Sequence, residues 1–388
     1  MISTAKKKLQ LAVIVIFLTA LGVSFTLLAQ AQNPSSTPSP VADWRPNRAP
    51  QGWRFVGSKA CAECHAAKVK TQTATHMGRA LFTTEKADVL RANPRLTYRN
   101  GQYNYQLTRD GNRTIYAVND GVNTLSVPIF YVFGDADMGQ TYVLQYKDKF
   151  YEGRVSFYSD IKGLDITMGH ALKPPATLVE AMGREMKMDE TRACFGCHST
   201  NALNGVNLQF DQMIDGVTCE ACHGPGEKHV AAMQAGELDQ KQIFNPKKLS
   251  TEDLANFCGT CHRTWEQVAV LGIRGPMNVR FQPYRLTNSK CFDSEDQRIS
   301  CLACHDPHEP RKRDAAFFDS KCTACHSAAT KVTPAAFKEA GKRDARPCPT
   351  GKANCVSCHM PKIEIPGSHF KFSDHHIRIV RPGDPYPN

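Results

Sequence analysis

Seven copies of one five-residue pattern, Cys-x-x-Cys-His, constrain this chain of 388 residues more than any other feature. They use 14 of its 16 cysteines. In chain order, the cysteine pairs are Cys61/Cys64, Cys194/Cys197, Cys219/Cys222, Cys258/Cys261, Cys301/Cys304, Cys322/Cys325 and Cys355/Cys358. The histidines that follow them are His65, His198, His223, His262, His305, His326 and His359. We number these motifs one to seven.

The chemistry of haem attachment explains each part of this pattern. Two thiols bond to the two vinyl groups of one haem, and the next histidine becomes an axial ligand of the iron. A disulfide scaffold needs no histidine after each cysteine pair, and a thioredoxin-like site uses a single motif. Zinc ribbons lack the trailing histidine. The sequence therefore predicts seven covalently bound c-type haems.

Two cysteines, Cys291 and Cys348, lie outside the motifs. In an exported protein a leftover pair most often forms a disulfide. Because the distance between them cannot be read from sequence, this pair is a disulfide candidate and free thiols are the alternative.

The beginning of the chain predicts export. A basic run, Lys6-Lys7-Lys8, precedes an uncharged apolar stretch over residues 9–32, and Ala29-Gln30-Ala31 is typical of a signal-peptidase site. We expect a signal peptide over 1–31 and a periplasmic or cell-surface protein. The alternative is an uncleaved membrane anchor, because the apolar stretch is just long enough to span a bilayer.

The rest of the chain divides by composition. Residues 32–52 are a Pro/Ser-rich linker, 53–94 a first haem-binding segment, 95–160 a β-rich insert and 161–388 a six-haem region. Six motifs in such a short region leave little room for a side-chain core. We therefore expect a haem-packed, mainly α fold with much irregular loop and a small antiparallel β insert. Apolar–polar alternation and Asn-Gly or Asp-Gly turns predict its strands at 95–99, 103–109, 113–118, 124–132, 140–146 and 149–157.

The charge balance is informative only together with the cofactor. The formal net charge is +11, and a basic chain often binds nucleic acid or anionic membrane. Fourteen propionates, together with removal of the three N-terminal lysines, would bring the mature holoprotein to about −6. We therefore expect no nucleic-acid partner. Runs such as Arg311-Lys312-Arg313 and Lys342-Arg343 are candidate counter-charges for propionates, and a solvated surface is the alternative.

Seven further histidines are candidates for the second axial position of each iron. Because His375 and His376 are neighbours, only five or six of the set are expected to reach iron. One haem would then be open or would take a methionine such as Met77, Met168 or Met360. The candidates are His76, His170, His229, His308, His369, His375 and His376.

The spacing of His308 is the most informative of these. It lies three residues after His305, so on a helical turn both side chains lie on the same side. The two axial ligands of one iron must approach from opposite faces. His308 should therefore bind a different haem from the one that His305 binds, and a similar argument applies to His229 after His223.

The motif surroundings resemble a known group of proteins. The segments 56–65, 75–77, 219–229, 304–308 and 355–361 resemble exported multihaem cytochromes related to the tetrahaem carrier of ammonia oxidisers. Similar runs recur in decahaem conduit cytochromes and in pentahaem and octahaem reductases. The resemblance covers roughly residues 53–80 and 190–378 and leaves out the β-rich insert.

This resemblance implies electron transfer, mostly bis-histidine haems, and distal roles for His76, His229, His308 and one of His375 or His376. The chain departs from pentahaem nitrite reductases, because none of its seven motifs ends in Lys. That departure argues against a reductase of that kind.

The predicted function is electron transfer in a respiratory or extracellular chain, so a non-catalytic role is favoured. Expected partners are other cytochromes or a quinol-oxidising membrane complex. One alternative is an oxidoreductase with one open haem that acts on a small nitrogen or sulfur oxyanion. The other is a subunit of an oligomer or haem filament.

Overall fold

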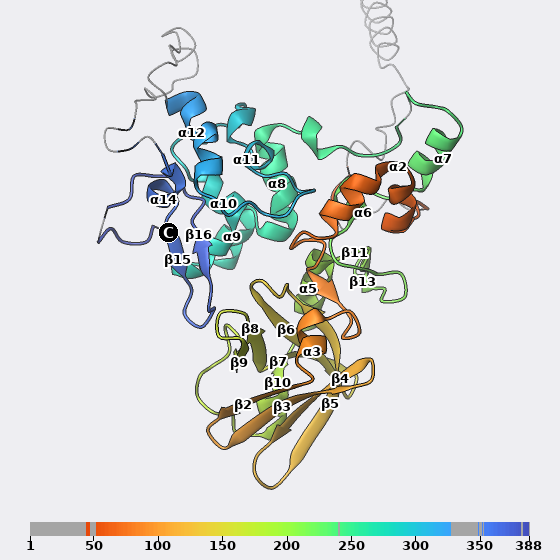
Figure 1. The fold of residues 1–388 in the computed structure, drawn as a ribbon, viewed down its shortest axis with the longest axis vertical. Coiled ribbons are helices and arrows are strands. Elements are labelled where there is room, and N and C mark those ends of the chain that lie inside the picture. The colour runs from red at the N-terminus through yellow and green to blue at the C-terminus, as the bar shows by residue number, and fades with distance from the viewer. Residues whose placement is uncertain are drawn as a thin grey trace, which may run out of the picture. The chain divides into compact units, whose positions relative to one another are not determined.

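A computed structural model describes residues 44–46, 52–239, 241–326, 348, 351, 353–381 and 383–387 (Figure 1). The predicted signal peptide lies outside these residues, and so do Lys342 and Arg343. Within the described ranges, no helix has the length and apolar character needed to cross a membrane.

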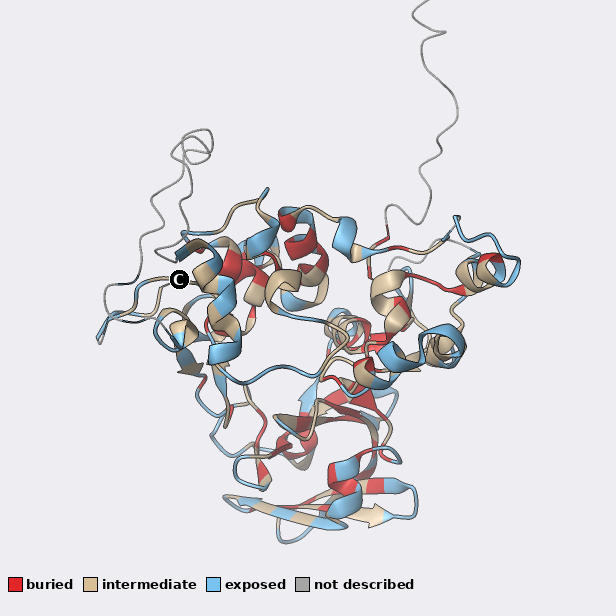
Figure 2. Cartoon of the chain, turned by 45° about the horizontal axis from the view of Figure 1, so that its top comes forward, coloured by how far each residue is buried: buried red, intermediate tan, exposed pale blue. Residues whose placement is uncertain are grey.

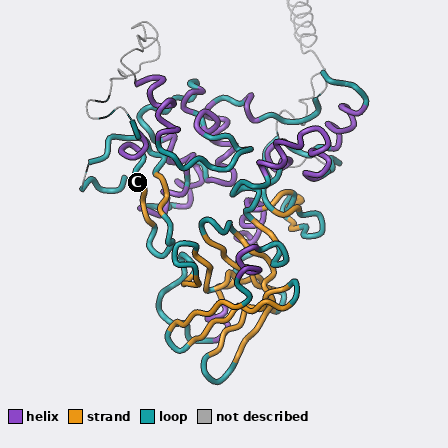
Figure 3. The backbone as a smooth tube through the Cα atoms, in the orientation of Figure 1, coloured by secondary structure: helices purple, strands orange, loops and turns teal. Residues whose placement is uncertain are grey.

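A ten-stranded antiparallel sheet is the largest regular element of the chain (Figures 1 and 3). Its main path runs β10-β7-β6-β5-β4-β3-β2, with β1 added beside β5, and β8 joining β6 to β9. The strands are β1 (Leu81–Phe82), β2 (Arg95–Asn100), β3 (Tyr103–Asp110), β4 (Arg113–Asn119), β5 (Thr124–Phe133), β6 (Gly139–Tyr146), β7 (Lys149–Gly153), β8 (Val155–Tyr158), β9 (Gly163–Ile166) and β10 (Gly183–Glu185).

The sheet has an apolar core of its own. Alternate residues of β3 and β4, such as Tyr105, Leu107 and Tyr116, are at most 1% exposed, as the period of two of a half-buried strand requires. Helices α3 (Asp88–Ala92) and α4 (Leu178–Met182) contribute to the same cluster. Each such side chain contributes about 1.5–3 kcal/mol when fully buried, so this part of the fold is stabilised without any cofactor.

The expectation of a mainly α fold with a small β insert is wrong. The sheet begins at Leu81 and ends at Glu185, so it extends beyond both ends of the expected insert at 95–160. The added strands are too short to show a period in sequence: β1 has two residues and β10 has three. They are strands only because they pair with other strands of the sheet; β1, for example, pairs with β5 so that Leu81 lies opposite Phe133.

Short helices carry the seven motifs, and loops connect them (Figure 3). These helices are α2 (Gly57–Gln72), α5 (Met188–His198), α6 (Cys219–His223), α8 (Thr251–His262), α11 (Cys301–Cys304), α12 (Asp319–His326) and α14 (Cys355–His359). The other helices are α7 (Glu227–Gln234), α9 (Trp265–Leu271) and α10 (Gln282–Thr287), with 3₁₀ turns at Pro246–Lys248, Gly275–Arg280, Gln297–Ile299 and Ala316–Phe318. Small two-stranded sheets pair β11 (Ser199–Thr200) with β14 (Ile214–Asp215), β12 (Leu203–Asn204) with β13 (Asn207–Leu208), and β15 (Lys362–Glu364) with β16 (Lys371–Ser373).

Burial differs between the two kinds of structure. Buried residues concentrate on the strands, whereas the motif helices are mostly half-buried or exposed (Figure 2). An aromatic cluster joins α5 to the sheet: the Phe195 ring is fully buried and lies 5.1 Å from Phe133 and 5.0 Å from Phe210, centroid to centroid. The sheet therefore fixes the position of the second motif.

Candidate functional site

Helical turns aim the two thiols of a motif the same way, and in most motifs the histidine as well, whereas His305 follows α11 in extended backbone. Residues three and four apart share one face of a helix, so the two thiols and the histidine of a Cys-x-x-Cys-His motif project together. Helices α6 and α14 begin at the first cysteine and end at the histidine. In α2 the backbone leaves helical geometry at His65, with φ −115° and ψ 34°. The local fold thus presents two thiols and one imidazole to a single bound group.

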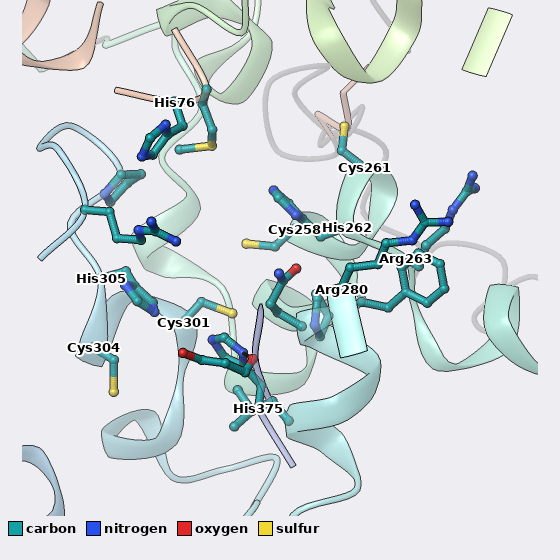
Figure 4. Close-up of a pocket in the computed structure, with 18 of the residues that line it drawn as sticks. His76, Cys258, Cys261, His262, Arg263, Arg280, Cys301, Cys304, His305 and His375 are labelled. Atoms are coloured by element: carbon teal, nitrogen blue, oxygen red, sulfur yellow. Dashed lines mark hydrogen bonds between the residues drawn. The ribbon is translucent and has the colours of Figure 1, made fainter. Parts of the chain in front are cut away.

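The cysteines and histidines of motifs two to seven line one cavity of about 3580 Å³. An ordinary ligand pocket has about 300–1000 Å³, so the space fits several large groups. In Figure 4, side chains of motifs four and five and His375 project from different elements into this cavity. Its lining includes twelve Lys and Arg against eight Asp and Glu, an excess that suits the anionic propionates of bound haem.

Three motif histidines lie beside a histidine from another part of the chain, with the two ring planes 13–38° apart. His65 pairs with His229 at 6.4 Å between ring centroids and 13° between planes. His223 pairs with His308 at 5.9 Å and 14°, and His305 pairs with His375 at 6.2 Å and 38°. Two imidazoles bonded to one metal from opposite sides have centroids roughly 6.4 Å apart, taking about 2.0–2.1 Å per metal–nitrogen bond. The centroid distances of all three pairs are close to this value.

Hydrogen bonds set the tautomers of these histidines. Nδ1 of His198, His223, His229, His359 and His375 lies 2.5–3.2 Å from a backbone carbonyl oxygen. A carbonyl only accepts, so Nδ1 carries the proton and Nε2 keeps its lone pair. Nε2 is therefore free to bind a metal in all five rings.

Burial keeps several motif histidines neutral. It lowers the pKa of His198, His223, His262 and His305 below the ordinary value. It lowers the pKa of His375 to about 4, with the neighbouring His305 adding to the effect. Because a metal binds the neutral form of imidazole, these rings are ready to ligate at neutral pH.

The other candidate histidines lie in different surroundings. His76 lines the cavity, with Nδ1 3.4 Å from the Asp135 carboxylate. His170 directs Nε2 to Glu152 at 3.0 Å, and His369 directs Nε2 to Asp165 at 2.8 Å. Only His76, among these three, lines the cavity.

His376 and the spare cysteines have less defined surroundings. His376 is half-buried, and its backbone N–H donates to the Asp374 carboxylate at 3.0 Å. Cys291 and Cys348 are both exposed, and their disulfide stays a prediction.

Thiols of different motifs lie close enough to one another for each to shift the pKa of the other. The contacts join Cys61 to Cys219, Cys197 to Cys261, Cys258 to Cys301 and Cys322 to Cys355. Motifs that are far apart in sequence, such as the first and the third, are therefore neighbours in space. Together with the histidine pairs, these contacts link all seven motifs.

Some residues of the site had no signal in the sequence. Arg280 lines the cavity near Arg263 and Glu152, and its buried Nε has no hydrogen-bond partner among the described residues. Burial lowers its pKa, and the Arg263 charge lowers it further. Arg263 directly follows the fourth motif, which is the one clue that sequence offered. Two guanidinium groups at the wall of the cavity can hold an anionic group such as a propionate.

Comparison with known proteins gives three similarities. Residues 170–224 match the family model described as cytochrome c554 and c-prime. The chain is 24% identical over 181 residues to the multiheme cytochrome MtrA of Shewanella baltica, covering 44% of this chain and 45% of that protein. It is 23% identical over 179 residues to the high-molecular-weight cytochrome c of Nitratidesulfovibrio vulgaris, covering 44% of this chain and 26% of that one.

Among solved structures, the chain is similar to the crystal structure of the outer cell wall cytochrome OcwA. That likeness has a TM-score of 0.47 and 16% identity, and it covers 83% of this chain and 79% of the other. The chain spans less than half the length of the two curated relatives. The family match and these relatives, together with the Cys-x-x-Cys-His motifs, support a multihaem c-type cytochrome with covalently bound haem.

Proposed function

We propose that this protein is an exported heptahaem c-type cytochrome that transfers electrons in a respiratory or extracellular electron-transfer chain. The observation that carries this proposal is the crossed histidine pairing. His229 follows the third motif and faces the first, His308 follows the fifth and faces the third, and His375 follows the seventh and faces the fifth. Shared ligation of this kind holds successive haems within a few residues of one another.

The two sets of contacts support a continuous relay. Histidine pairs join motifs one, three, five and seven in series, and thiol contacts connect motif two to four, four to five and six to seven. Haem, when bound, supplies reversible one-electron chemistry. The chain holds the axial ligands in place and sets the local charge.

The hydrogen-bond partners of the axial histidines differ along this relay, and this difference supports distinct reduction potentials for the haems. In the pair with His223, His308 donates Nδ1–H to the Asp306 carboxylate at 3.0 Å, whereas in the pair with His65, His229 donates to the Lys241 carbonyl at 2.5 Å. A carboxylate partner raises the basicity of a ligating histidine more than a carbonyl does. We propose other cytochromes or a quinol-oxidising membrane complex as redox partners, and no nucleic acid.

Haem counting on variants tests the proposal. Intact mass and pyridine haemochrome assays of the purified protein should give seven haems per chain. The double variant Cys61→Ala, Cys64→Ala should give six, and the matched control Cys291→Ala should still give seven. An anaerobic redox titration should then show all haems reduced and reoxidised reversibly. A count that does not fall in the double variant would contradict the assignment.

A second candidate function is reduction of a small nitrogen or sulfur oxyanion at an iron with an open axial position. It is favoured by a set of charged groups near Cys194, where Glu152 accepts from His170 at 3.0 Å and from Arg184 at 2.8 Å. Arg280 lies close enough to Glu152 for the two charges to interact. Such groups can bind an anion and deliver protons. Turnover of nitrite or sulfite with a reduced donor, lost in Glu152→Gln, would support this function.

A further inference from the structure

His170 and His369, two of the seven candidate distal ligands, form hydrogen bonds to carboxylates. In each, Nε2, the atom that the other axial candidates leave free for a metal, faces a carboxylate oxygen, at 3.0 Å in His170 and 2.8 Å in His369. A carboxylate only accepts, so Nε2 carries a proton and offers no lone pair. This is the reverse of His198, His223, His229, His359 and His375, whose Nδ1 is the donor.

Packing holds both histidines in these positions. The His170 side chain is 4% exposed, and its partner Glu152 lies on β7. The His369 ring lies 4.6 Å from the ring of Tyr158 on β8, and its partner Asp165 on β9 also accepts from the Tyr98 hydroxyl at 2.7 Å. Turning either ring away would remove a partner from a half-buried carboxylate. Both histidines therefore fasten loops to the sheet.

Their location agrees with this role. Four further proximal histidines, His198, His262, His326 and His359, line the cavity. Neither His170 nor His369 lines it.

Counting then leaves the irons short of histidine. Seven irons have fourteen axial positions, and the chain has fourteen histidines. Two of these histidines, His170 and His369, bind carboxylates, so twelve remain for iron. Even if both His76 and His376 bind iron, two axial positions therefore have no histidine. Building on the proposed seven haems, we infer that at least two irons, among those held by His198, His262, His326 and His359, keep an axial position open to a small external ligand.

Carbon monoxide, which binds reduced haem iron only at an accessible position, is the probe. The haem count comes first, so that a failure of the seven-haem proposal is recognised separately. A protein with seven haems should, after reduction with dithionite, take up two or more equivalents of carbon monoxide in a photometric titration. The oxidised protein should show a matching high-spin fraction by EPR.

Histidine variants make the test specific. His170→Ala and His369→Ala should leave the carbon monoxide stoichiometry and the high-spin fraction unchanged. His229→Ala and His308→Ala, which remove members of stacked pairs, should each raise both by one haem. Circular dichroism and the haem count confirm that each variant is folded and loaded.

Two results would overturn the inference. One is uptake of fewer than two equivalents by the seven-haem protein, which would also be the outcome if Met77, Met168 or Met360 closed these positions. The other is a gain of one equivalent in His170→Ala or His369→Ala, because that gain would show the histidine to be an iron ligand.

Discussion

Replacement of Asp374 by Asn should destabilise the C-terminal part of the chain strongly. Asp374 and Arg285 are both fully buried, and the guanidinium donates from Nε to Oδ1 at 2.8 Å and from a terminal nitrogen to Oδ2 at 2.9 Å. Arg378 donates to the same Oδ2 at 2.6 Å. The amide keeps nearly the same shape but carries no charge, so the Arg285 cation would stay buried without its counter-ion.

The expected magnitude follows from that geometry. Removal of one partner of a buried ion pair costs about 3–5 kcal/mol. That is a large part of the roughly 5–15 kcal/mol by which a folded protein is stable. At about 1.4 kcal/mol per power of ten, the folding equilibrium should fall by two to more than three powers of ten. Guanidinium denaturation of the holoprotein, followed by far-UV circular dichroism, measures the change.

An exposed ion pair provides the control. Glu185 and Lys149 pair at 2.8 Å with side chains 50% and 57% exposed, so Glu185→Gln should cost less than about 1 kcal/mol. If Asp374→Asn cost as little as this control, the Arg285 environment would be hydrated and the reasoning from burial would be refuted.

Three further changes test how the motifs are held. Glu220 is buried and accepts from the backbone N–H of Val56, Gly57 and Gly226 at 2.7–2.8 Å, so Glu220→Gln should lower the free energy of unfolding by about 1.5–3 kcal/mol. Phe195→Ala should cost about 3–5 kcal/mol, because its ring is fully buried; a loss below 1 kcal/mol would contradict a packed contact between α5 and the sheet. A Cβ on Gly216 would lie 2.1 Å from the Gly78 carbonyl oxygen, so Gly216→Ala should lower the thermal midpoint more than Gly205→Ala, where φ is also positive but space is open.

Alternation in the sequence located most strands but not the extent of the sheet. Strands β3 and β4 lie within one residue of the expected 103–109 and 113–118. The segment 149–157 was expected as one strand and forms two, because the chain bends at Arg154. Strand β7 pairs with the end of β6 and with β10, whereas β8 pairs with the beginning of β6 and with β9. Pairing of β1 and β10 depends on partners some 30 to 50 residues away, which no local pattern records.

The histidines show a similar division. Spacing assigned His308 to another haem than His305 on the assumption of a helical turn, but the backbone at His305 is extended, with φ −125° and ψ 134°. The structure nevertheless places His308 against His223 of another motif. Spacing could not show that His170 and His229 have different roles. They differ in the ring nitrogen that makes the hydrogen bond, which is Nε2 in His170 and Nδ1 in His229. The partners, Glu152 and the Lys241 carbonyl, are brought to them only by the fold.

The crossed histidine contacts also bear on how the polypeptide matures. Each contact closes a loop of chain, over residues 65–229, 223–308 and 305–375, and each loop begins before the preceding one has closed. Closure of a loop lowers the entropy of the chain, and only the free energy of the completed contact offsets this cost. A chain emerging from its N-terminus would therefore complete these contacts in order, and the last would wait for His375.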